Sequence, residues 1–257
     1  MRKMFFVQKV MTLLVFVGLT VLQIRAATFT TNATADAFVA TGPTSNLNGN
    51  NYGGGGALAL SAPGFTNGEF QSVLQFNTSG AKSSFDSVFG AGLWSVQSVT
   101  LQLSAGTPNN AIFNGNAAGS FGISWMQNDS WTEGSGTPSA PGGTGITYNT
   151  LQSTFINPAD EALGSFSYNG ANSGTFVYTL GTPSGFSADM LAGNVISFRL
   201  AAADSAISYF FSSRTFGTAA NRPLLTINAV AVPEPAAMAL LTCGLSLFAM
   251  RRWQARR

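Results

Sequence analysis

Three residues of one short stretch, Asp129, Trp131 and Glu133, have side chains that could bind a sugar. An indole face can stack on a pyranose ring, and flanking carboxylates can accept hydrogen bonds from its hydroxyls. Trp131 lies in a loop-like stretch, which favours an exposed ring. The alternative is that Trp131 fills the core while the two acids face solvent. Trp125 lies in an alternating run and is interpreted as a core residue.

The acidic residues allow two further kinds of site, and the sequence selects neither. Nine carboxylates lie between residues 27 and 232, and a glycosidase needs only a suitably spaced pair of them. Asp36, Asp129 and the Asp160-Glu161 pair, with nearby carbonyls, could hold calcium. No spacing typical of an EF-hand supports that alternative, so the metal site is unknown and no other cofactor is expected.

The absence of histidine and the presence of a single cysteine exclude several classes of enzyme. The chain has no histidine, and its single cysteine, Cys243, lies close to the C-terminus. Ser-His and Cys-His triads and His-containing zinc sites are therefore excluded, and no disulfide can form within the chain. With no catalytic residues identified, we expect a protein that is not an enzyme.

The charge of residues 27–232 excludes a further class of partner. This segment carries only Lys82, Arg199, Arg214 and Arg222 against nine acids, a net charge of −5. Binding to nucleic acid rests on a basic surface that neutralises phosphates. We therefore expect no nucleic-acid partner.

The N-terminal residues have the pattern of a secretory signal peptide. Arg2, Lys3 and Lys9 precede the largely apolar run 10–22, and small residues follow at Ala26 and Ala27. A basic region, an apolar core and small residues at the cut site are typical of such signals. We predict a signal peptide over residues 1–26, removed after Ala26.

The C-terminal residues have the pattern of a short membrane segment. Residues 236–250 carry no charge, and an Arg-rich tail, 251–257, follows them. As a helix these fifteen residues reach about 22 Å, against ~30 Å for the hydrocarbon core. Long Arg side chains can snorkel across part of that gap, and they should stay on the cytoplasmic side. The basic N-terminus should stay there too, so residues between the two ends are predicted to lie outside the cell.

Together, Pro233-Glu234-Pro235, the apolar run and the tail beginning Arg251-Arg252 resemble the sorting signal of the PEP-CTERM family of exported bacterial proteins. The resemblance covers roughly the last 25 residues and defines a sorting segment over 231–257. It implies that a membrane enzyme, an exosortase, recognises these five residues and removes the segment. The alternative is that the helix remains as a permanent anchor.

The middle of the chain has the period-2 alternation of half-buried strands. The alternating or strand-like runs are 36–40, 57–61, 71–76, 99–104, 121–125, 165–168, 176–180, 196–200, 208–212 and 225–228. Only Ser184–Ala192 is predicted as a helix, ending at Gly193. The Gly53–Gly56 run lacks the Lys-Ser/Thr ending of a phosphate loop and is interpreted as a flexible turn. We predict an all-β domain over 27–230, an antiparallel, jelly-roll-like β-sandwich.

The order of short motifs resembles the DNRLRE-type β-sandwich, a domain of extracellular bacterial proteins that is similar to carbohydrate-binding modules. The motifs are Asp36-Ala-Phe38, Asn51-Tyr52-Gly53, 73–77, 99–103, 129–133, 196–200, Ser213-Arg214 and 222–227. The chain departs from the family at Gln71 and Asn77, where a basic residue and an aspartate are usual. The resemblance implies an adhesive, non-enzymatic domain.

These observations favour an exported surface or matrix protein that adheres to extracellular polysaccharide or to envelope partners. Two alternatives stay open: a structural envelope protein without a ligand, and a carbohydrate-active hydrolase or lyase. The scarcity of Lys and Arg and the lack of His weigh against a lyase, which needs a base and a charge-neutralising cation.

Overall fold

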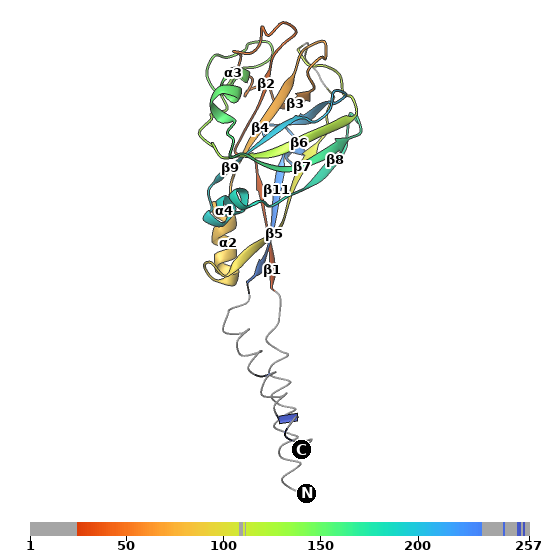
Figure 1. Cartoon of the computed structure of the whole chain (residues 1–257). Helices are drawn as coiled ribbons and strands as arrows, with labels where there is room; N and C mark the ends of the chain where they lie inside the picture. The colour runs from red at the N-terminus through yellow and green to blue at the C-terminus, as the bar shows by residue number, and fades with distance from the viewer. Residues whose placement is uncertain are drawn as a thin grey trace.

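The computed structural model describes residues 25–107, 110, 112–232, 244, 251, 252 and 254, and this part is all-β with two antiparallel sheets (Figure 1). The predicted all-β, antiparallel fold class is therefore confirmed. The first sheet has the strand order β1 (Ala26–Asn32), β11 (Leu224–Ala231), β5 (Trp94–Ser104) and β8 (Thr175–Leu180). The second has the order β10 (Ser208–Ser212), β3 (Ala57–Ser61), β4 (Phe70–Asn77), β9 (Val195–Ala202), β6 (Gly119–Met126) and β7 (Glu161–Tyr168), with β2 (Ala35–Ala40) also paired to β4.

The two sheets share one apolar core. Leu101 and Leu225 of the first sheet pack in the same buried cluster as Leu74 and Phe198 of the second. Since successive side chains of a strand point to opposite faces, the alternation in each run decides which residues enter this core. Full burial of a leucine or phenylalanine side chain contributes about 1.5–3 kcal/mol to the stability of the fold.

Two helices, α2 (Ser79–Phe89) and α4 (Ser184–Ala192), lie together at one end of the domain (Figure 1). α4 has the predicted bounds, and Gly193 ends it with a φ of 75°. The sequence pattern does not predict α2, because its Ser and Gly content is poor for helix formation. Ala81 and Phe85, one turn apart, are buried in the core, and this packing supplies the stability that propensity lacks.

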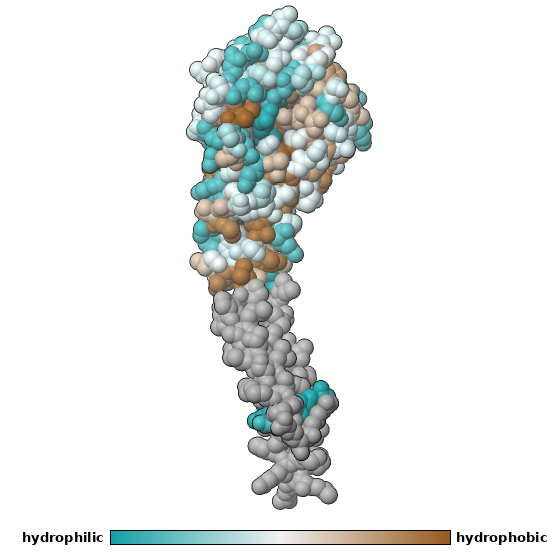
Figure 2. Space-filling model, viewed as in Figure 1, coloured by the Kyte–Doolittle hydropathy of each residue, from teal (hydrophilic) through white to brown (hydrophobic). Residues whose placement is uncertain are grey.

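The two ends of the 25–232 segment leave the domain side by side (Figure 1). Ala26 pairs with Val230, and Ala231 N–H donates to Arg25 O at 3.1 Å. Figure 2 shows apolar residues gathered at this end of the domain, beside α2. Val88 near the end of α2, Leu93 before β5 and Val232 after β11 are exposed apolar residues.

Several predicted features lie outside the described residues: the signal peptide up to residue 24, Pro233, Glu234, Pro235 and the apolar run 236–250 apart from Gly244. Arg251 and Arg252 are described, as exposed helical residues. Among the described residues, none of the helices has the length and apolar character needed to cross a bilayer.

A long connection between β6 and β7 covers the outer face of the second sheet. This covering loop, residues 127–160, contains the short helices α3 (Tyr148–Thr150) and η1 (Leu151–Phe155). Its buried apolar side chains pack on outward-facing residues of β2, β4 and β6; the cluster consists of Ala37, Val39, Val73, Met126, Trp131, Ile146 and Leu151. The sheet therefore has apolar contacts on both faces.

Candidate functional site

Asn51, between β2 and β3, is the centre of the polar contacts that hold the covering loop. Its side chain is fully buried and uses every hydrogen-bonding position. The amide Nδ2 donates to the carbonyls of Glu133 at 2.7 Å and Ile146 at 2.8 Å. The Oδ1 atom accepts from the N–H groups of Gly53 at 3.2 Å and Gly136 at 3.1 Å. One side chain thus joins four backbone groups from three parts of the chain.

The glycines around Asn51 are required by close backbone approach. A Cβ on Gly53 would lie 1.9 Å from the Glu133 carbonyl oxygen, and one on Gly136 would lie 1.9 Å from Asn51 O. Real Cβ atoms are not found at such distances from backbone oxygen. The interpretation of Gly53 as part of a merely flexible turn is therefore wrong, because this glycine is packed against the covering loop.

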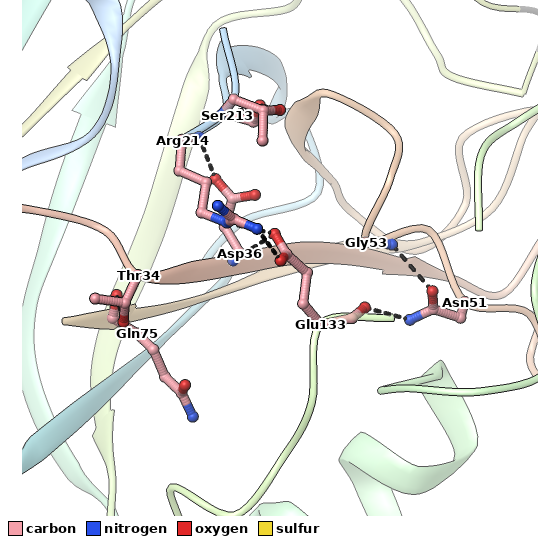
Figure 3. A network of polar contacts seen from close by, with 9 residues as sticks. Thr34, Asp36, Asn51, Gly53, Gln75, Glu133, Ser213 and Arg214 are labelled. Carbon is pink, nitrogen blue, oxygen red and sulfur yellow. Dashed lines mark hydrogen bonds and ion pairs between the residues drawn. The ribbon is translucent and has the colours of Figure 1, made fainter. Parts of the chain in front are cut away.

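Beside Asn51, two carboxylates and one guanidinium form a compact network (Figure 3). Arg214, just after β10, makes an ion pair with Glu133 of the covering loop through Nη2, and its Nε donates to Oε1 at 2.7 Å. Asp36 on β2 is 1% exposed and accepts from the Arg214 backbone N–H at 2.6 Å. The Asp36 N–H in turn donates to Glu133 Oε1 at 3.2 Å. The network joins β2, the covering loop and the segment after β10.

The pKa values of Asp36 and Arg214 are both raised in this network, for different reasons. Desolvation raises the pKa of Asp36 to about 7, and the nearby Glu133 adds to the rise, while the contacts with Arg214 oppose it. The hydrogen bond to Glu133 is the main reason that the pKa of Arg214 lies above its usual value. The network has one positive group and two carboxyl groups. When Asp36 is protonated and neutral, the charges of Arg214 and Glu133 cancel.

We predict that the protein becomes less stable as the pH rises from 5 to 7. The pKa of Asp36 is about 7 in the folded chain against 3.8 for an ordinary aspartate, so between these limits the folded state keeps a proton that the unfolded state has released. Stability therefore falls as the pH rises through this window, by about 1.4 kcal/mol for each pH unit. Asp129, whose pKa is raised to about 6, acts in the same direction. Thermal melting of the full chain at several pH values measures the effect.

The matched variant is Asp36→Asn, which resembles the neutral acid and keeps an oxygen to accept from Arg214 N–H. It should reduce the fall in melting temperature between pH 5 and 7 to the smaller part contributed by Asp129. An unchanged slope in the variant would show that Asp36 does not titrate in this range.

The expectation of an exposed ring at Trp131 is wrong. The residue is 3% exposed and packs in the cluster beneath the covering loop. Its Nε1–H donates to Ser197 Oγ on β9 at 2.9 Å, so the polar edge of the ring is satisfied inside the protein. No face is left on which a sugar ring could stack. The expected burial of Trp125 is confirmed, at 5% exposure.

Asp129 and Glu133 do not converge with Trp131 on a common surface. Glu133 is bound to Arg214, as described above. The Asp129 carbonyl accepts from Gln75 Nε2 at 2.7 Å, which ties the loop to β4. Burial raises the pKa of the Asp129 carboxyl to about 6, and contacts with Ser197 oppose this rise. The three residues anticipated as a glycan site are thus held in contacts that attach the loop to the sheet.

The acids at 160 and 161, considered as calcium ligands, accept hydrogen bonds from backbone N–H groups of different segments. Asp160 accepts from the N–H groups of Gln127 at 2.9 Å and Asn157 at 3.0 Å. Glu161 accepts from Gly185 and Phe186 at the start of α4, and these bonds lower its pKa. Across the residues that the structure describes, no three His, Cys, Asp or Glu side chains gather closely enough to hold an ion.

A second polar cluster attaches the other half of the covering loop. Tyr148 OH donates to Glu69 at 2.7 Å, and Gln71 on β4 donates to the same carboxylate at 2.5 Å. Arg199 Nε donates to Gln71 Oε1 at 2.7 Å, and burial lowers the pKa of this arginine. Gln71, one of the two positions where the chain departs from the DNRLRE pattern, therefore makes structural contacts of its own.

A search of protein-family models finds no match to this chain, and a search of curated proteins finds none either. The resemblances to the PEP-CTERM and DNRLRE families remain predictions from motifs. Within the latter, the sequence marks Asp36, Asn51 and Arg214 only as motif residues and does not join them. The signal that could have joined them is the scarcity of cations: Arg214 is one of four basic residues in 27–232, so a buried carboxylate has few possible partners.

Proposed function

We propose that this chain is an exported, non-enzymatic surface protein, processed at its C-terminus by an exosortase-type enzyme and adhering to extracellular polysaccharide or envelope partners. On this proposal the two sheets form a jelly-roll-like β-sandwich outside the membrane. The observation that carries the proposal is the pairing of β1 with β11. It brings Arg25 and Val232 together, so the predicted signal and sorting segments leave from one end of the domain.

The length of the connection supports a position close to the membrane. Only residues 233–235 separate Val232 from the apolar run that begins at Ala236, and three extended residues span about 10 Å. The domain end that carries the exposed Val88, Leu93 and Val232 would then face the bilayer interface before processing. Exposed apolar side chains are favourable in that environment.

The burial of Trp131 favours a second candidate, a structural envelope component without a ligand. A covering loop held by two polar clusters and an apolar cluster is what such a component needs, because it resists opening without any bound partner.

Cell fractionation and mass spectrometry test the proposed export and processing. The full chain should reach the surface, and its mature C-terminus should lie near Pro233–Ala236. Deleting Met1–Ala26 should trap the protein inside the cell. Changing Glu234, or removing Arg251–Arg257, should leave unprocessed precursor in the membrane. A soluble cytoplasmic precursor would contradict export, and an intact tail on surface material would show a permanent anchor.

A further inference from the structure

The outer face of the first sheet carries a row of four threonines in register. Thr30 of β1 pairs with Thr226 of β11, Thr226 pairs with Thr100 of β5, and Thr100 pairs with Thr179 of β8. The adjacent residues of these strands, among them Leu101 and Leu225, point into the core, so the four threonines point away from it. Thr30 and Thr179 are exposed, and Thr100 and Thr226 on the inner strands are half-buried. We call these residues the threonine row.

Polar uncharged side chains continue on both sides of the threonine row. Thr28, Asn228 and Ser98 form the next register line, and Thr28 Oγ1 donates to Asn228 Oδ1 at 2.6 Å. Asn228 Nδ2 donates to Ser98 Oγ at 3.0 Å, which fixes the orientation of the amide. The line on the other side contains Asn32, Gln102 and the apolar pair Leu224 and Val177.

The face differs from an ordinary solvated sheet surface in its charge. None of the residues in β1, β11, β5 and β8 is charged, although the segment 27–232 carries thirteen charged side chains. Threonine alone is common on a strand, where its branched side chain packs well. Exposed sheets and their edge strands usually also carry Lys or Glu, which prevent adhesion to other chains. This face has no such protection.

We infer that this face is a docking surface for a neutral polysaccharide with extended, hydroxyl-bearing chains. The inference rests on the proposed surface function and names where adhesion occurs. Neighbouring strands place the four residues of the row ~4.8 Å apart, over about 14 Å in total. A hydroxyl both donates and accepts, so it matches sugar hydroxyls in either direction.

The chemistry of the face selects a neutral partner. An anionic polymer would need cations, and these four strands have none. Each neutral hydrogen bond contributes only about 0.5–1.5 kcal/mol, so affinity must come from many bonds formed together. β-Branched side chains on a paired sheet are already restricted in rotation, which reduces the entropy lost on binding.

The test is a pull-down of the full chain, purified in mild detergent, on insoluble cellulose and chitin as neutral probes and on immobilised alginate as the anionic probe. We expect retention on at least one neutral polymer and none on alginate. Replacing the whole threonine row by valine keeps side-chain shape and strand propensity but removes the hydroxyls, and should lower the retained fraction about tenfold. The control changes four exposed threonines elsewhere to valine: Thr66, Thr132, Thr144 and Thr182.

A second variant, with a single substitution, tests the same surface in case the fourfold valine variant does not fold. Thr179→Lys places a charge on edge strand β8, where lysine is well tolerated, and should also weaken retention. Absence of binding to both neutral polymers, or equal loss in the control, would overturn the inference. So would a dimer in sedimentation that the valine variant makes monomeric, since the face would then pair two copies of this chain. Export and C-terminal processing are measured separately, so their failure is distinguishable from failure of this docking surface.

Discussion

Replacing Asn51 by alanine is expected to lower the free energy of unfolding by about 3–5 kcal/mol, one of the two largest effects predicted for this chain. The substitution leaves the carbonyls of Glu133 and Ile146 and the N–H groups of Gly53 and Gly136 without the partners that they have in the folded protein. Each unpaired buried group costs about 1–3 kcal/mol, and partial entry of water reduces the total. The melting temperature of the full chain should fall by roughly 10 °C or more.

The matched control is Asn149→Ala, which truncates an exposed asparagine in α3 of the same covering loop. Its effect should stay within about 0.5 kcal/mol, as for surface positions in general. Limited proteolysis adds a local readout, because the Asn51 variant should be cut faster within residues 127–160. Equal melting temperatures for the two variants would show that Asn51 does not hold the loop.

Replacing Trp131 by alanine should cost about 3–5 kcal/mol, as truncation of a buried aromatic side chain generally does. The variant loses the packing of the indole against the apolar cluster under the covering loop and leaves Ser197 Oγ without the Nε1–H donor. Chemical denaturation should show a lower midpoint. The same variant should keep polysaccharide retention at temperatures where it is folded, because Trp131 packs against the second sheet, whereas the threonine row lies on the first.

Two comparisons make this result interpretable. Trp131→Phe keeps most of the ring and loses the N–H, so its cost should be smaller than that of alanine. Val177→Ala removes a side chain that is 61% exposed and should change stability little. A stable Trp131→Ala variant with impaired glycan binding would reinstate the ring as a binding residue.

Ten of the eleven strands in the described residues were predictable because their signal is local, whereas β1 has no counterpart among the predicted runs. The alternation in β5, β6, β8, β9 and β11 predicts which residues face the core, and the structure buries those residues, Phe176 of β8 only partly. α4 was equally predictable, since Gly193 marks its end. α2 was not, because its helix depends on Phe85 reaching a core built from distant strands.

The candidate site could not be predicted in the same way, because its contacts are non-local. Asn51 binds backbone groups 82 and 95 positions further along the chain, at Glu133 and Ile146. Trp131 was open to two interpretations since an aromatic residue in a loop can be exposed or folded back on a sheet. Its burial follows from the apolar outer face of the second sheet, to which Val39 and Val73 contribute.

The position of β11 in the first sheet also affects how the domain resists a pulling force. This strand lies between β1 and β5 and continues directly into the C-terminal segment. If the C-terminal segment remains as a membrane anchor, a pull on the end of β11 directed along the strand acts at right angles to its hydrogen bonds with both neighbours. The bonds of both ladders then bear the load together instead of opening one after another. A domain anchored in this way to a cell and gripping a polymer by the same sheet would resist detachment by shear flow.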